Sequence, residues 1–417
     1  MQKRLRNLFL SNTFKDTGKI FAGNIFSSFL AICFFVLAAR VLGPGNFGIF
    51  SSVISLSLIF IAIGDFGLGS ALFRFVSAEL KDTKKASKIL EFLFNLRVGS
   101  ATAFLIILLV FSPLISVITF GEINMFYVFI SILNAFFFLI VDFEIQKYQS
   151  RKQFKTASIY IVLVNFFRVL GLVFLVLINI KDYKYFLAIY ALSSGVTFCF
   201  LYFVEPIQLK LGADWKVKFR DVFHFSGWMG LNKLLSSIGS RIDVILIYRI
   251  LTPYETGIYS ASKQLSFGVP LFVGSFATVI APRFSSISEK DLYMYLKKTI
   301  GLSVLICFGL IFGIIVSPFI IGLFGSEYAH SLAVLRILLF SYIPFVLSTP
   351  AVNYIIYALK KPRVIFYITL FDVFVVILGN MFFLPRFGVI GSSYLQVVVN
   401  TVLFFFANVY LFSKIKT

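Results

Sequence analysis

Long apolar stretches separated by short polar segments run along almost the whole chain. Several of these stretches contain no Asp, Glu, Lys or Arg, among them 20–39, 41–64, 98–120, 185–204, 337–359 and 387–413. A membrane-spanning helix needs roughly 20 mostly apolar residues. The pattern therefore predicts an all-α membrane protein with twelve transmembrane helices, with approximate cores at 19–39, 47–69, 92–118, 124–145, 157–179, 184–205, 223–250, 256–281, 299–324, 332–358, 364–384 and 388–413.

The composition agrees with the pattern. Of the 417 residues, 59% are hydrophobic and 13% are charged, whereas soluble domains have about 25% charged residues. The three cysteines, Cys33, Cys199 and Cys307, lie singly in apolar stretches, a spacing that predicts neither a metal site nor a disulfide framework. No short apolar stretch with a small-residue cleavage site follows M-Q-K-R-L-R-N, so we expect no cleavable signal peptide.

The distribution of basic residues predicts the orientation. With both termini in the cytoplasm, 27 of the 38 Lys and Arg residues fall in inside segments, five in outside loops and six within spans. Cytoplasmic loops of membrane proteins carry this excess of basic residues. The net charge of +20 is then spread over short loops that meet anionic lipid headgroups, and we expect no nucleic-acid partner.

An internal duplication is the clearest signal in the sequence. Arg40 begins the string R-V-L-G-P-G-N-F-G-I-F-S and Arg249 begins R-I-L-T-P-Y-E-T-G-I-Y-S, with six of twelve positions identical at an offset of 209 residues. The same offset brings Arg74 onto Arg283. The chain therefore repeats itself, and the register of the repeat holds over several predicted helices.

The repeated motif lies where the first helix of each half ends and the second begins. Pro44 and Pro253 suit the first turn of a helix, where a missing N–H costs nothing. Gly48 and Gly257 permit close contact between helices. A rigid helical hairpin without a ligand explains the motif sufficiently.

Each half of the repeat contains six predicted spans. Because six is even, both halves enter the membrane from the same side and are related by an axis along the membrane normal. We predict an amino-terminal six-helix lobe at 1–208, a cytoplasmic linker at 209–222 and a carboxy-terminal six-helix lobe at 223–417, with a central cleft between the lobes. That architecture is typical of alternating-access transporters.

Several strings resemble those of Wzx-type flippases, the polysaccharide and O-antigen transporters of the multidrug/oligosaccharidyl-lipid/polysaccharide exporter superfamily. They are A-R-V-L-G-P-G-N-F-G-I-F-S (39–51), G-D-F-G-L-G-S-A-L-F-R (64–74), R-I-D (241–243), G-I-Y-S-A-S-K-Q-L (257–265) and I-A-P-R-F-S (280–285). The resemblance covers the whole chain. The loop F-R-F-V-S-A-E-L-K-D-T-K-K does not fit the major-facilitator pattern.

The resemblance implies a non-enzymatic carrier in the bacterial inner membrane. Such a carrier moves an undecaprenyl-diphosphate-linked glycan from the cytoplasmic to the outer leaflet, for O-antigen, capsule or exopolysaccharide assembly. Its partners would be that glycan, membrane lipids and polysaccharide polymerase machinery. No cofactor, metal or catalytic residue is implied.

Six basic residues lie within predicted spans. A charge at mid-bilayer costs from about 2.5 kcal/mol upward, so it usually faces a cavity or a partner. Lys233 and Arg241 are eight residues apart on one helix, which places them within about 80° of each other. We predict that they bind the diphosphate together with Lys263 and Arg168, because a diphosphate needs compensating charge. Internal ion pairing or snorkelling is the alternative.

Other charged residues have other expected roles. Arg97 and Arg336 are near span ends and are expected to snorkel to the interface. Asp65, Asp243 and Asp372 are candidates for proton or sodium coupling, as are Asp142 and Glu144, with caps or salt bridges as the alternative. Since side chains at i and i+2 do not face each other on a helix, Asp243 does not pair with Arg241, and it either has a partner on another helix or titrates.

Two other functions compete with a flippase. A cation-coupled multidrug exporter of the same superfamily would have the same fold, but the basic seventh helix favours an anionic substrate. A membrane-embedded glycosyltransferase or polymerase would need a large loop with carboxylates. The longest loop has roughly 17 residues by its hydropathy bounds, which disfavours this class.

Overall fold

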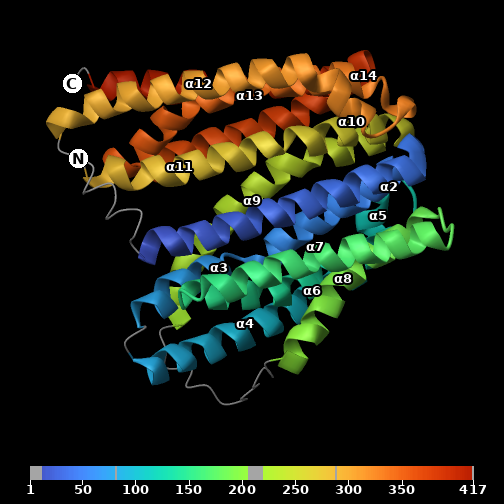
Figure 1. Cartoon of the computed structure of the whole chain (residues 1–417), viewed down its shortest axis with the longest axis horizontal. Helices are drawn as coiled ribbons and strands as arrows, with labels where there is room; N and C mark the ends of the chain where they lie inside the picture. Colours follow the sequence, from blue (N-terminus) through green and yellow to red (C-terminus); the bar gives the residue numbers. More distant parts are fainter. Residues whose placement is uncertain (1–11, 80–81, 205–218, 287–288, 416–417) are drawn as a thin grey trace. The chain divides into compact units, whose positions relative to one another are not determined.

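The structure is a computed structural model that describes residues 12–79, 82–204, 219–286 and 289–415 (Figure 1). Within these ranges the chain is helical and has no β-strand. The predicted all-α fold is thereby confirmed. The elements are α2 (Asn12–Asp65), α3 (Leu68–Ala71), the π-helix η1 (Leu72–Val76), α4 (Thr83–Val110), α5 (Ser112–Phe120), α6 (Met125–Ser150), α7 (Phe154–Leu177), α8 (Tyr183–Val204), α9 (Phe219–Ile250), α10 (Pro253–Ser266), α11 (Gly268–Ser286), α12 (Glu289–Gly322), the 3-10 helix η2 (Ser326–Tyr328), α13 (Ser331–Asn353), the π-helix η3 (Tyr354–Ala358) and α14 (Pro362–Ile415).

Two of the longest helices each contain a break at a glycine. Gly43 in α2 has φ 68° and Gly388 in α14 has φ 58°, a left-handed backbone that is readily open to glycine. Pro44 follows the first break directly and occupies the first turn of the next helix. Each of these elements is therefore a pair of helices joined at a kink.

Among the described residues, nine helical segments are long and apolar enough to cross a membrane. Two of them, Gly23–Asp65 and Pro362–Lys414, contain the breaks described above and so comprise two helices each. The more polar α9 is not among the nine. If α9 also crosses the membrane, the described helices account for the twelve predicted spans.

The chain divides into two compact units that do not follow its linear order. Unit 1 comprises Met1–Val41 and Val53–Ser237, and unit 2 comprises Leu42–Ser52 and Ile238–Thr417. The second part of α2 thus begins in unit 2 and continues in unit 1, and α9 starts in unit 1 and ends in unit 2. The predicted linker residues 209–218 lie outside the described residues. The predicted lobe boundaries and orientation remain predictions.

Unit 1 is built around α6, which packs against α4, α7 and α8. Its core includes Leu93 and Phe143, both buried. Polar side chains of α6 also tie it to α2: the Ser131 hydroxyl donates to the Val53 carbonyl at 3.0 Å, and the Asn134 amide donates to the Ser57 hydroxyl. Such interhelical hydrogen bonds join helices in membranes, where apolar contact alone gives little preference over lipid.

Unit 2 is built around α13, which packs against α12 and α14; the three lie side by side in Figure 1. A reciprocal pair of hydrogen bonds joins α13 to α10. The Ser262 hydroxyl donates to the Ser331 carbonyl at 2.7 Å, and the Ser331 hydroxyl donates to the Ile258 carbonyl at 2.9 Å. These bonds fix α10, which carries one of the candidate site residues.

The two copies of the repeated motif pack against each other within unit 2. A Cβ atom added at Gly48 would lie 1.8 Å from the Pro253 carbonyl oxygen, and one added at Gly257 would lie 1.9 Å from the Pro44 carbonyl oxygen. Neither position leaves room for a side chain. The prediction that these glycines permit close helix contact is confirmed, and the contact joins each motif to its own repeat.

Candidate functional site

The predicted site residues fall in both units. Asp65, Arg168 and Lys233 belong to unit 1, and Arg241, Asp243, Lys263 and Asp372 belong to unit 2. The charged residues of α9 are shared between the units: Lys233 lies in unit 1, which ends at Ser237, and Arg241 and Asp243 lie in unit 2.

In unit 1 a buried carboxylate holds two cations from different helices. Asp65, the last residue of α2, is 1% exposed. Its Oδ1 accepts from Arg97 Nη2 of α4 at 2.5 Å, and its Oδ2 accepts from Lys233 Nζ of α9 at 2.9 Å. Bonds between charged groups are the stronger hydrogen bonds of proteins, so this cluster links α2, α4 and α9.

Access to this cluster is unequal. The Arg97 side chain is 0% exposed, whereas that of Lys233 is 45% exposed. The prediction that Arg97 snorkels to the interface is wrong, because its guanidinium lies beside Asp65 instead. Asp65 and Arg97 partly neutralise each other's buried charge. Lys233 is the member of the cluster that molecules outside it can reach.

A second carboxylate belongs to the same group of charges. Asp142 of α6 interacts electrostatically with Lys233, Arg97 and Asp65, and its Oδ2 accepts from the Gln146 side-chain amide at 2.5 Å. The group therefore contains two acids and two bases. Sequence reasoning did not assign Arg97 to the site, although a base inside an apolar stretch is itself the signal that could have included it.

Arg168 is also buried in unit 1, in a separate setting. Its guanidinium carbon lies 3.8 Å from the centre of the Tyr190 ring. Nε donates to the Ser193 hydroxyl at 3.3 Å, and Nη1 donates to the Asn165 side-chain oxygen at 3.2 Å. Stacking on an aromatic ring and these bonds stabilise the cation where it lies, and they connect α7 with α8.

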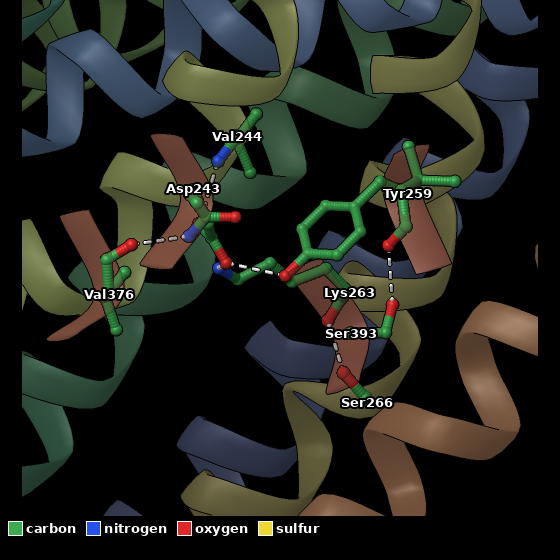
Figure 2. A network of polar contacts seen from close by, with 9 residues as sticks. Asp243, Val244, Tyr259, Lys263, Ser266, Val376 and Ser393 are labelled. Carbon is green, nitrogen blue, oxygen red and sulfur yellow. Dashed lines mark hydrogen bonds and ion pairs between the residues drawn. The ribbon is translucent and has the colours of Figure 1, made fainter. Parts of the chain in front are cut away.

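In unit 2 Asp243 is the centre of the second cluster (Figure 2). Its Oδ2 accepts from the Tyr259 hydroxyl at 2.6 Å and forms an ion pair with Lys263 Nζ. Oδ1 accepts from the backbone N–H of Val244 at 2.8 Å. The prediction that Asp243 takes a partner from another helix is confirmed, since Tyr259 and Lys263 both belong to α10. Lys263 is only 14% exposed, so this pair is largely enclosed.

Arg241 and Asp372 are the other two predicted residues in this unit. The guanidinium carbon of Arg241 lies 5.1 Å from the centre of the Phe267 ring, and its charge also acts on Lys263. Asp372 of α14 has a buried Oδ1 without a hydrogen-bond partner among the described residues. Within the described ranges Asp372 therefore has no ionic partner comparable to those of Asp65 and Asp243.

Where the chain is described, no group of three His, Cys, Asp or Glu side chains could hold a metal ion. Asp65 and Asp243 instead hold ion pairs in otherwise apolar helices. Of the two lysines that were predicted to bind substrate, Lys233 is the more exposed, at 45% of its side chain against 14% for Lys263.

Comparison with known proteins gives a family match over most of the chain. Residues 13–288 match the family described as polysaccharide biosynthesis protein. A protein of Shigella flexneri named for O-antigen transport is 24% identical over 340 residues, covering 73% of this chain and 75% of the relative. A protein of Haloferax volcanii named as a probable low-salt glycan biosynthesis flippase is 26% identical over 401 residues, covering 92% of this chain and 81% of the relative.

Solved structures agree on the fold. A lipid II flippase, MurJ, in an inward closed conformation superimposes with a TM-score of 0.74 at 16% identity, over 95% of this chain and 87% of that one. An inward-facing multidrug resistance transporter of the MATE family gives a TM-score of 0.70 at 14% identity, over 94% of this chain and 96% of that one. At these identities the likeness concerns the fold, which is that of multi-pass transporters with two lobes.

Proposed function

The chain belongs to the polysaccharide biosynthesis protein family, and on that premise we propose that it is a flippase for lipid-linked oligosaccharides. It moves an undecaprenyl-diphosphate-linked repeat unit from the cytoplasmic to the outer leaflet of the inner membrane, with both termini in the cytoplasm. The names of its relatives, which concern O-antigen transport and glycan flipping, support this substrate class.

The observation that carries the proposal is Lys233. Its side chain is 45% exposed on a helix of a membrane protein, and a charge in that setting faces water or a polar ligand rather than acyl chains. A diphosphate is the part of a lipid-linked glycan that needs a cation. Lys233 therefore meets the charged group of the substrate, and Arg168 is a buried cation in the same unit.

We further propose that transport proceeds by alternating access. α2 and α9 each run from one compact unit into the other, so relative movement of the units would require both helices to bend. The break at Gly43 offers such a point in α2. Asp372, which lacks an ionic partner among the described residues, is the candidate for proton or sodium coupling, and a polysaccharide polymerase would take up the product.

Reconstitution into liposomes tests the proposal. The probe is an undecaprenyl diphosphate that carries a fluorescent disaccharide, and dithionite quenches the fluorophores in the outer leaflet. We expect protein-dependent movement of the probe between leaflets. Lys233→Ala should slow it about tenfold, since a charge-assisted hydrogen bond is worth about 1.5–3 kcal/mol.

The control variant is Lys361→Ala, which removes an exposed lysine directly before α14 and should leave the rate unchanged. Transport of a cationic dye by the same liposomes, without movement of the lipid probe, would refute the flippase and favour a multidrug exporter with this fold.

A further inference from the structure

The three charged residues of this cluster, Asp65, Arg97 and Lys233, differ in how they can respond to a ligand. Asp65 and Arg97 are 1% and 0% exposed, and Lys233 is 45% exposed. A lysine also has a flexible four-carbon stem, which lets its ammonium move without the helix moving. Lys233 is therefore the one member of this trio that can exchange its partner for an anion from outside.

Arg97 has unused hydrogen-bonding capacity beside the carboxylate that it already bonds. Only its Nη2 bonds Asp65, at Oδ1. Its Nε and Nη1 are buried and have no partner among the described residues. An arginine can hold both oxygens of a carboxylate at once. If Lys233 leaves Oδ2, a spare donor of Arg97 is available for that oxygen.

We propose that Asp65 is the counter-anion of Lys233 in the resting state, and that the substrate's diphosphate takes the place of Asp65 when it binds. Arg97 is the positioning residue that lowers the free-energy cost of this replacement. This inference rests on the proposed function, because the incoming anion is the diphosphate of the carrier lipid. In the resting state Lys233 bonds Asp65. In the loaded state Lys233 bonds the diphosphate, and Arg97 bonds both oxygens of Asp65.

The exchange also explains why an acid lies beside a substrate-binding cation. A lysine without Asp65 would hold the diphosphate more tightly and release it more slowly. Asp65 competes for Lys233 and so favours release on the far side of the membrane.

The cluster in unit 2 provides the contrast. Asp243 also pairs with a lysine, but Lys263 is 14% exposed, and the Tyr259 hydroxyl occupies the same carboxylate oxygen at 2.6 Å. An outside anion reaches Lys263 poorly. Exchange is therefore assigned to the pair in unit 1, and the pair in unit 2 serves as the matched control.

The test measures binding of farnesyl diphosphate to the full-length protein in detergent, by isothermal titration calorimetry, together with the flipping rate in liposomes. We expect Asp65→Asn to bind about tenfold more tightly than wild type (about 1.4 kcal/mol) and to flip more slowly. Adding Lys233→Met to this variant should abolish the gain. Asp243→Asn should bind no more tightly than wild type.

Two further variants keep the test decisive if Asp65→Asn folds poorly. Asp65→Asn combined with Arg97→Gln removes the buried pair as a unit and should also tighten binding. Arg97→Lys retains the charge but lacks the planar guanidinium that can hold both carboxylate oxygens at once, so it should bind the diphosphate more weakly than wild type. A purely structural role for Arg97 would not give opposite changes in affinity.

The outcomes separate this inference from the proposed function. If wild type binds farnesyl diphosphate but removal of Asp65 leaves its affinity unchanged or weaker, the exchange is refuted and the flippase stands. If wild type and every variant fail to bind the diphosphate, the proposed function fails and the exchange fails with it.

Discussion

The contact between the two motif copies gives a prediction that can be worked from distances. In Gly257→Ala the new Cβ would lie 1.9 Å from the Pro44 carbonyl oxygen, whereas ordinary contact begins near 3.5 Å. The opposing atom is backbone, so the two helices must separate by roughly 1.6 Å. Overpacking of this kind costs about 3 kcal/mol. Gly48→Ala should lose a similar amount of stability, because its Cβ would lie 1.8 Å from the Pro253 carbonyl oxygen.

Thermal unfolding in detergent, followed by size-exclusion chromatography, measures this effect. Gly45→Ala is the matched control, since it changes a glycine of the same motif that has nothing within 4 Å of its added Cβ. It should melt at or above the wild-type temperature, because alanine favours a helix over glycine by up to about 1 kcal/mol. Combining Gly48→Ala with Gly257→Ala should cost less than the sum of the two, since both act on one contact. Equal melting of Gly257→Ala and Gly45→Ala would refute the contact.

Three further predictions concern stability and use the same thermal assay. Lys263→Met should destabilise by about 3–5 kcal/mol, because it leaves Asp243 buried without its cation, and adding Asp243→Asn should recover most of the loss; no recovery would contradict the pairing. Arg168→Lys should cost about 1–2 kcal/mol, since lysine lacks the planar group that lies over Tyr190, and wild-type melting would contradict that packing. Gly43→Ala should cost about 1–2 kcal/mol because it forces an L side chain into left-handed backbone, and an unchanged melting temperature would argue against the break.

Features that depend on local pattern were accessible from the sequence. The helices follow from runs of apolar residues, and the duplicated motif follows from identical letters at a fixed offset. The need of Asp243 for a partner on another helix follows from helix geometry alone, and the structure supplies Lys263 and Tyr259. In each case the relevant physics acts within one helix or one repeat.

Features that depend on tertiary contact were not accessible in the same way. Arg97 lies near the end of a predicted span, where snorkelling is the ordinary expectation. Its burial follows from Asp65, which is 32 residues away in the chain. The sharing of α2 and α9 between units is likewise set by which surfaces pack together, and a hydropathy profile contains no information on that choice. The same holds for the difference in exposure between Lys233 and Lys263.

The most direct test of the central claim is native mass spectrometry of the purified protein in a mild detergent. An undecaprenyl-diphosphate glycan and a cationic dye are offered together as competing ligands. A flippase for lipid-linked glycans should retain the diphosphate lipid, and Lys233→Ala should reduce the retained fraction. Retention of the dye in preference to the lipid would contradict the account.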